Sequence, residues 1–243
     1  MYYSNLFSST IGKKNNEFKQ IKSIKSGIKL TDNYTVLRQC NLSREKNKLY
    51  FYKKKTKEIL EKYNCIEAKN YSFLYSINGL ALIPREENES KNKILLCACK
   101  NYLKNQKNGI LIVNIKFNDK NNIINKKDYF YDTKEFEVYC LCPIINFNQK
   151  NILNNNIGED TDYFLVGGFN KRKKKGIIKL YKVIFDNKNF NNKIEYIEDI
   201  FIDNNFKGPI SCIVQANSGN FIITCWDECP FSLVKKYRLL FKI

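Results

Sequence analysis

One arrangement of strands and turns occurs three times in this sequence. An apolar, β-rich run is followed by a Lys/Asn-rich turn and then by a second β-rich run. The three copies span residues 94–117, 163–185 and, more weakly, 220–243. In the first two copies a glycine, Gly109 or Gly176, closes the turn. Because one such unit leaves its apolar face uncovered, units of this kind must stack on one another. The repeat therefore predicts a stacked, all-β architecture.

The apolar runs along the chain predict a series of antiparallel strands. Turn-forming residues separate the runs and no ten-residue stretch has a convincing helical pattern, so we expect meander connections. Residues 27–40 predict two short strands, and residues 48–63 predict a strand followed by either a strand or a short helix. The later strands fall into groups of four, four and three: residues 71–83, 94–100, 109–117 and 127–131; then 137–145, 163–168, 176–185 and 193–202; then 208–216, 220–226 and 233–241.

Four-stranded antiparallel meanders that recur along a chain are typical of a β-propeller, in which each sheet is one blade around a common axis. We therefore predict a single β-propeller-like domain over residues 27–243, behind a loose leader at residues 1–26. The blades are expected at residues 27–67, 70–134, 136–203 and 207–243. Four blades lie at the lower limit for closure. A closed ring, a partial ring completed by a partner and a fragment of a larger propeller all stay open as interpretations.

The sequence over residues 162–243 contains short motifs that punctuate blades in a known propeller family. Its motifs are Val166-Gly167, Gly176-Ile177-Ile178, Lys207-Gly208-Pro209-Ile210 and Gly219-Asn220. In these motifs the chain resembles blades of the cleavage-and-polyadenylation-factor A and damaged-DNA-binding family. Trp226-Asp227 is also similar to the Trp-Asp pair of WD-repeat proteins, although the Gly-His signature is absent because the chain has no His. The resemblance implies a protein-interaction platform in a larger assembly and carries over no partner-binding residue.

The chain is strongly basic, with 42 Lys and Arg against 24 Asp and Glu and a net charge of +18. Such a charge attracts phosphates and anionic membrane surfaces. However, only five of the basic residues are Arg, the side chain that nucleic-acid readers use for bidentate contacts. The abundance of Lys and Asn is also what an AT-rich coding sequence produces by mutational drift. The charge therefore supports two interpretations, solubilising drift and a polyanion partner.

The densest basic run, Lys171, Arg172, Lys173, Lys174 and Lys175, occupies a predicted hairpin turn. A solvated loop is the simplest interpretation of such a run. A phosphate-binding site and a nuclear-import signal are the alternatives. These five residues are the candidate polyanion-binding residues of the chain.

Nine cysteines and no histidine limit the chemistry that the chain can perform. Cys97 and Cys99, like Cys140 and Cys142, lie two residues apart in apolar runs, which puts each pair on one face of a strand. Buried structural thiols are the favoured interpretation, with a metal site or disulfides as alternatives. The odd number of cysteines and the lack of a recognisable secretory leader predict a reducing, intracellular location in the cytoplasm or nucleus. No apolar run is long enough to predict a transmembrane segment.

The sequence predicts a protein without catalytic residues, cofactor or metal. Histidine-dependent acid–base chemistry and Ser-His-Asp or Cys-His arrangements are excluded, and no glycine-rich phosphate-binding motif occurs. We therefore expect a non-catalytic scaffold that binds protein partners through loops at one rim and at the mouth of the axis. One alternative is a module that binds DNA, RNA or phosphoinositide through Lys171 to Lys175. A second alternative is a propeller enzyme, which needs several carboxylates converging at the axis.

Overall fold

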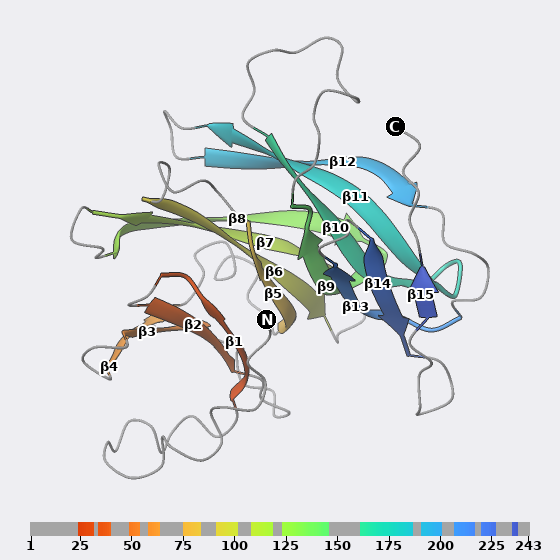
Figure 1. Cartoon of the computed structure of the whole chain (residues 1–243), viewed down its shortest axis with the longest axis horizontal. Helices are drawn as coiled ribbons and strands as arrows, with labels where there is room; N and C mark the ends of the chain where they lie inside the picture. Colours follow the sequence, from red (N-terminus) through yellow and green to blue (C-terminus); the bar gives the residue numbers. More distant parts are fainter. Residues whose placement is uncertain are drawn as a thin grey trace.

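The chain folds into β-strands joined in four antiparallel sheets (Figure 1). The structure, a computed structural model, describes residues 24–31, 34–39, 49–53, 58–63, 75–83, 91–101, 108–118, 123–145, 161–186, 191–200, 207–216, 220–226 and 235–237. The described residues form strands and turns without a helix. No helix within these residues is therefore long and apolar enough to cross a membrane.

Each sheet is a meander of consecutive strands. The first sheet contains β1 (Ile24–Lys29), β2 (Tyr34–Gln39), β3 (Leu49–Lys53) and β4 (Glu58–Tyr63); the second contains β5 (Tyr75–Leu82), β6 (Asn92–Asn101), β7 (Asn108–Phe117) and β8 (Ile123–Lys134). The third contains β9 (Phe136–Pro143), β10 (Thr161–Asn170), β11 (Lys175–Asp186) and β12 (Asn191–Ile200), and the fourth contains β13 (Ile210–Gln215), β14 (Phe221–Cys225) and β15 (Lys235–Tyr237).

The predicted all-β class and the antiparallel four-stranded sheets are confirmed. Each strand predicted beyond residue 71 overlaps an observed strand, and the groups of four, four and three strands are those of the last three sheets. Residues 58–63, for which strand and helix were both open, form strand β4. β1 begins at Ile24, inside the span given to the leader; residues 1–23 of that leader lie outside the described residues.

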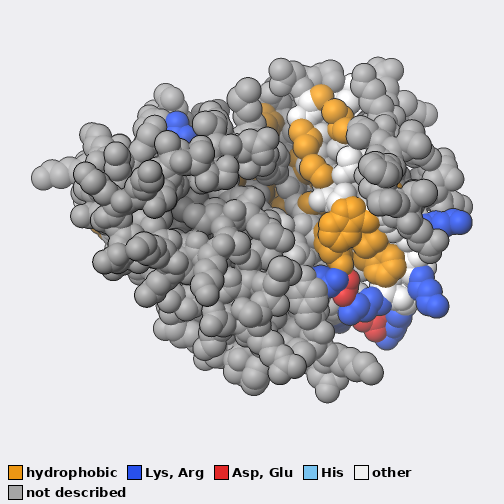
Figure 2. Space-filling model, turned by 90° about the horizontal axis from the view of Figure 1, so that it is seen from below, with side chains coloured by type: hydrophobic (Ala, Val, Ile, Leu, Met, Phe, Trp, Pro, Cys, Tyr) orange, Lys and Arg blue, Asp and Glu red, His pale blue; other side chains and the backbone are white. Residues whose placement is uncertain are grey.

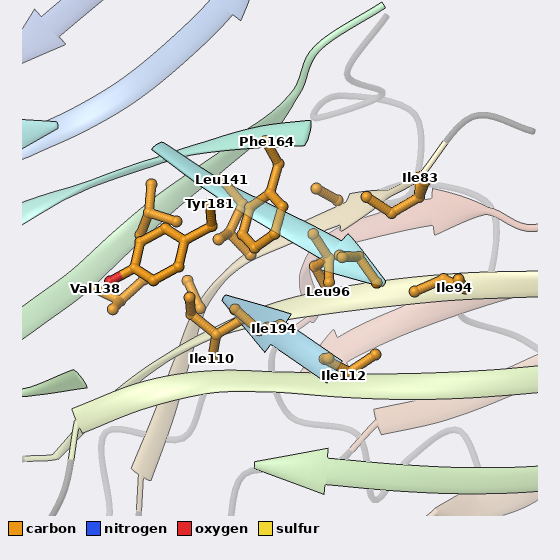
Figure 3. Packing of buried hydrophobic residues seen from close by; sticks show 14 of the residues in the cluster. Ile83, Ile94, Leu96, Ile110, Ile112, Val138, Leu141, Phe164, Tyr181 and Ile194 are labelled. Atoms are coloured by element: carbon orange, nitrogen blue, oxygen red, sulfur yellow. The ribbon is translucent and has the colours of Figure 1, made fainter. Parts of the chain in front are cut away.

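The four sheets stack in chain order through three hydrophobic clusters. The first cluster joins the first and second sheets and includes Phe51 and Leu111. The second joins the second and third sheets, where Leu96 and Ile110 of one sheet pack against Phe164 of the other (Figure 3). The third cluster joins the third and fourth sheets. Each sheet therefore buries its apolar faces against its neighbours in sequence, as the repeat predicted.

The first strand of each sheet packs against the first strand of the next. β1 contacts β5, β5 contacts β9, and β9 contacts β13. Two glycines lie where neighbouring sheets approach closely, one on a first strand and one on a second strand. A Cβ atom on Gly79 of β5 would lie 3.1 Å from the Tyr139 carbonyl oxygen of β9, and one on Gly167 of β10 would lie 2.7 Å from Ile210 Cγ2 of β13. In Figure 1 the first and fourth sheets lie on opposite sides of the pair between them, so the described sheets follow one another in an open succession.

A β-bulge interrupts the first strand of every sheet. In each case one residue of the first strand has no partner in the register with the second strand. These extra residues are Lys25 of β1, Asn78 of β5, Tyr139 of β9 and Ser211 of β13. Bulges bend a strand and redirect side chains, and they occur frequently beside functional sites. Because the contacting first strands each carry a bulge, we expect a functional site along these strands.

The cysteine pairs lie where the period-two spacing predicted. Cys97 and Cys99 are buried in the first cluster, and Cys140 and Cys142 are buried in the third. None of these four described cysteines forms a disulfide. Burial raises the pKa of Cys99 to about 12 and that of Cys142 to about 11. The predicted burial of each pair on one face of a strand is confirmed.

Candidate functional site

Strand β9 brings together side chains from three sheets. Its bulge lies between the Cys140–Gly167 and Val138–Gly168 pairs, so Tyr139 is the extra residue. Around this bulge lie a set of side chains and the turn that connects β10 to β11. We call this group the β9 rim, and it consists of Lys100, Glu137, Tyr139, Lys171, Arg172, Lys173, Lys174, Lys175 and Trp226.

Glu137 is the centre of a charged cluster on the β9 rim. Its side chain is only 7% exposed. One carboxylate oxygen, Oε2, lies 3.0 Å from Lys100 Nζ of β6 and accepts a 3.0 Å hydrogen bond from the Tyr139 hydroxyl. The other, Oε1, lies 2.8 Å from Lys171 Nζ in the β10–β11 turn. Lys100 Nζ also donates a hydrogen bond to the Tyr139 hydroxyl. Both oxygens of this buried carboxylate are thus satisfied, as a buried charge requires.

The cluster holds its acid and its base in their charged forms. Burial opposes ionisation of Glu137, but the hydrogen bonds from Lys171, Lys100 and Tyr139 outweigh it and lower the pKa of the carboxyl group. Burial likewise opposes the charge on Lys100, yet its hydrogen bonds to Tyr139 and Glu137 raise the pKa of its ammonium group. The pKa of Tyr139 is raised, chiefly by burial. The two charges and one neutral phenol therefore persist across the neutral pH range.

An exposed aromatic ring adjoins this cluster. Trp226, directly after β14, is 55% exposed. Its ring lies edge-on to Tyr139, with centroids 5.3 Å apart and an interplanar angle of 78°. Its backbone amide donates a 2.9 Å hydrogen bond to the Pro209 carbonyl oxygen. Lys100 also contacts Tyr139, with its Nζ 4.6 Å from the ring centroid. Trp226 is thus an exposed, largely apolar ring that packs against a hydrogen-bonded tyrosine.

Four of the five sequence-predicted basic residues lie in the hairpin turn, and the fifth directly follows it. Lys171 to Lys174 form the turn between β10 and β11, and Lys175 begins β11; all five are exposed. Lys174 has a positive φ of 48°, and the Lys173 amide donates a 2.9 Å hydrogen bond to Asn170 Oδ1. The position of the run in a hairpin turn is therefore confirmed, whereas polyanion binding by these residues stays a prediction.

Ion pairs divide the basic run into two parts. Lys171 pairs with Glu137, and Arg172 pairs with Glu135, which precedes β9. In contrast, Lys173, Lys174 and Lys175 form no ion pair with any residue that the structure describes. The three lysines are the part of the run that is open to an external anion.

The turn and Trp226 are connected through the segment that enters the fourth sheet. A Cβ atom on Gly176, directly after the turn, would collide with the Gly208 carbonyl oxygen. Gly208 is followed by Pro209, whose carbonyl oxygen accepts the Trp226 amide. Lys207, which is exposed, precedes Gly208 and forms no ion pair within the described part of the chain. One face of the molecule combines exposed hydrophobic side chains with an adjoining group of basic and acidic ones (Figure 2).

The arrangement is suited to binding. The β9 rim and Lys207 carry seven basic side chains, whereas the carboxylates in contact with them belong to Glu135 and Glu137. Among the described residues no group of three or more His, Cys, Asp or Glu is placed to hold a metal ion. An excess of positive charge beside an exposed indole can bind an anionic group and an apolar group together.

Sequence reasoning located the basic turn but missed the residues that support it. The sequence pattern predicted Glu137 and Tyr139 as ordinary members of an alternating strand, and Trp226 as part of a vestigial Trp-Asp pair. The sequence feature that could have indicated a site is Glu137, a carboxylate in the otherwise apolar run of residues 136–142. A charge in a buried strand requires a partner; its partners, Lys100 and Lys171, come from other strands and turns and are not identifiable without the fold.

The comparison with known proteins gives no family assignment. No family model matches the chain, and no curated protein matches it either.

Proposed function

We propose that this chain is a propeller-like repeat protein that acts as a non-catalytic scaffold for protein partners. The propeller-like arrangement is supported by two features of the first strands, β1, β5, β9 and β13. They contact one another in succession, and each carries a bulge at the corresponding pairing with the second strand of its sheet. Equivalent inner strands that meet along a line are what blades around an axis require. The open succession of the described sheets favours a partial ring over a closed one.

The scaffold function rests on one observation: the β9 rim is composed of residues from three sheets. Lys100 comes from the second sheet, Glu137 and the basic turn from the third, and Trp226 from the end of β14 in the fourth. Binding surfaces assembled from loops and strand ends of several repeats are the means by which repeat proteins hold partners. A WD-repeat-like or damaged-DNA-binding-type platform remains our interpretation of the sequence motifs.

The location inside the cell and the absence of catalysis belong to the same proposal. The buried cysteines Cys97, Cys99, Cys140 and Cys142, which are not in disulfides, accord with a reducing compartment, either cytoplasm or nucleus. The enzyme alternative needs carboxylates on the first strands of the sheets. Glu137 is the carboxylate that these strands contribute among the described residues, and it already forms ion pairs with Lys100 and Lys171. A glycosidase-like mechanism would need a second carboxylic acid near Glu137.

Polyanion binding is the second candidate, and one observation favours it. Lys173, Lys174 and Lys175 are exposed and form no ion pair with a described residue. Binding to DNA, RNA or a phosphoinositide would then decline steeply as salt increases, because each neutralised phosphate releases counterions. Binding of protein partners by a scaffold need not depend steeply on salt.

The test is purification of the tagged chain from the cells that express it, followed by reconstitution with each recovered protein. We expect a partner that co-purifies at a fixed stoichiometry, survives nuclease treatment and forms a complex with the recombinant chain in analytical ultracentrifugation. Recovery of the chain alone, or a complex that nuclease dissolves, would contradict the scaffold function. The nuclease-sensitive outcome would support polyanion binding instead.

A further inference from the structure

The β9 rim has the features of a docking surface for one kind of partner segment. We propose that it binds an acidic peptide segment of a partner protein, with one apolar side chain of the segment against Trp226 and its carboxylates on Lys173, Lys174 and Lys175. This inference rests on the scaffold function and specifies the chemistry of the partner.

Trp226 is suited to anchor such a segment because it is exposed and supported from behind. It is 55% exposed, its amide is fixed by Pro209, and its ring lies on Tyr139. Tyr139 is in turn hydrogen-bonded to Glu137 and Lys100. Buried anchors of this type dominate the energy of protein interfaces, and an anchor that is already immobile loses little entropy on binding.

The positive charge beside Trp226 complements carboxylates. Lys173, Lys174 and Lys175 have no carboxylate partner in the described chain, and Lys207 lies next to Gly208, which contacts Gly176 directly after these lysines. The other two cations of the turn, Lys171 and Arg172, are held by Glu137 and Glu135. These two ion pairs fix the base of the turn, whereas the next three lysines extend from it toward solvent.

Three features favour an acidic peptide over a nucleic acid at this surface. The carboxylate of Glu137 lies within the rim and that of Glu135 lies beside it, where both would repel a continuous line of phosphates. Arg172 of the rim is paired with Glu135, so this carboxylate competes with a phosphate for the bidentate contact typical of Arg. The unpaired cations of the rim lie in one short turn, with Lys207 on the neighbouring segment, and this small group suits a few carboxylates rather than an extended backbone.

The experiment uses the purified full chain and three labelled probes in fluorescence anisotropy. The probes are a synthetic peptide with several glutamates around one leucine, the same peptide with glutamine in place of glutamate, and a thymidine oligonucleotide of similar length. Trp226 is the sole tryptophan, so its intrinsic fluorescence reports binding at the rim. We expect the acidic peptide to shift this fluorescence and to bind at least about tenfold more tightly than the glutamine peptide.

Two variants and two matched controls locate the binding surface. Trp226→Ala and the double variant Lys173→Glu/Lys175→Glu should each weaken the acidic peptide by about tenfold or more. Tyr129→Ala removes a different exposed aromatic side chain on β8, and Lys116→Glu/Lys127→Glu reverses two exposed lysines of the second sheet. Lys116 is at the opposite end of β7 from Gly109, the residue that pairs with Cys99 beside Lys100. Both controls should bind as the wild type does.

Three results would overturn the inference: no binding of the acidic peptide at low salt, an equal loss in the control variants, or tighter binding of the oligonucleotide. The result also separates this inference from the scaffold function. A co-purifying partner that is retained by Trp226→Ala and by Lys173→Glu/Lys175→Glu would refute docking at the rim and leave the scaffold function intact. Failure to recover any partner would refute the scaffold function itself.

Discussion

At the scale of single residues, Glu137 links three elements of the rim. It joins β6, β9 and the β10–β11 turn through Lys100, Tyr139 and Lys171. Its removal would take away the carboxylate that pairs with the half-buried Lys100 ammonium group, and breaking a buried ion pair is costly. The ion pair between Glu135 and Arg172 differs from that of Glu137 in its exposure, because the Arg172 side chain is 80% exposed.

We therefore expect Glu137→Ala to lower the free energy of unfolding by about 2–3 kcal/mol. The matched variant Glu135→Ala should cost less than about 0.5 kcal/mol, since a solvent-exposed ion pair contributes little. Urea denaturation at neutral pH measures both values. Equal losses in the two variants would show that Lys100 does not depend on Glu137.

The same carboxylate predicts a pH dependence. The native pKa of Glu137 is lowered, and an unfolded glutamate titrates near about 4.3. Its contribution to stability is therefore complete above that value and is lost as pH falls through the lowered native pKa. Lys100, Lys171 and Tyr139 face it. The raised pKa values of Lys100 and Tyr139 keep these two groups protonated over this range. The stability difference between wild type and Glu137→Gln should thus diminish under acid conditions; a constant difference in thermal melts from neutral to acid pH would contradict this.

At the scale of strands, bulges determine what each strand presents. The bulge residues of two neighbouring first strands, Asn78 of β5 and Tyr139 of β9, lie where these strands meet. There Asn78 Nδ2 donates a 3.2 Å hydrogen bond to the Val138 carbonyl oxygen of β9. The outer strands are also bulged, with Ile124 of β8 and Ile197 of β12 left out of register. These two residues are 55% and 38% exposed. A bulge makes an edge strand a poor template for another strand, which accounts for apolar side chains at these exposed positions.

The close packing of β10 against β9 and β13 predicts the cost of a methyl group at Gly167. A Cβ there would lie 2.5 Å from Cys140 Sγ and 2.7 Å from Ile210 Cγ2, so Gly167→Ala should destabilise the fold by about 1–3 kcal/mol. Gly79→Ala, whose nearest contact would be 3.1 Å, should cost less in the same urea titration. Adding Cys140→Ala should recover part of the Gly167→Ala loss, and a further loss equal to that of Cys140→Ala alone would refute the steric explanation.

The sequence predicted strand positions well because apolar, β-branched runs are a local signal, whereas strand ends and bulges are not local. β8 was predicted at residues 127–131 but runs from Ile123 to Lys134. Its polar ends are strand because they pair with β7, for example Lys126 with Ile115. Strict alternation would place Leu141 on the same face as Glu137 and Tyr139; the bulge at Tyr139 instead leaves Leu141 in the second hydrophobic cluster. The arrangement of the site could therefore not be predicted from the sequence of β9 alone, because the bulge is defined by the pairing of β9 with β10.

At the scale of the whole molecule, the three clusters make the two middle sheets the most protected part of the chain. The second sheet contributes to the first and second clusters, and the third sheet contributes to the second and third. Among the residues that the structure describes, those of the first sheet pack in the first cluster and those of the fourth sheet in the third. In stacked repeats each unit is stabilised by its neighbours, so units with two neighbours open less often than terminal ones.

Hydrogen exchange should report this order directly. We expect amides of β7 and β10 to exchange most slowly and those of β2 and β14 faster, because opening a terminal sheet breaks one interface and opening a middle sheet breaks two. Ile223 of β14 lies in the third cluster and is 1% exposed. Ile223→Ala should therefore accelerate exchange in β13 and β14 while leaving β7 unchanged, as followed by mass spectrometry. If β7 accelerated equally, the four sheets would open as one cooperative unit and the nearest-neighbour description of this fold would be wrong.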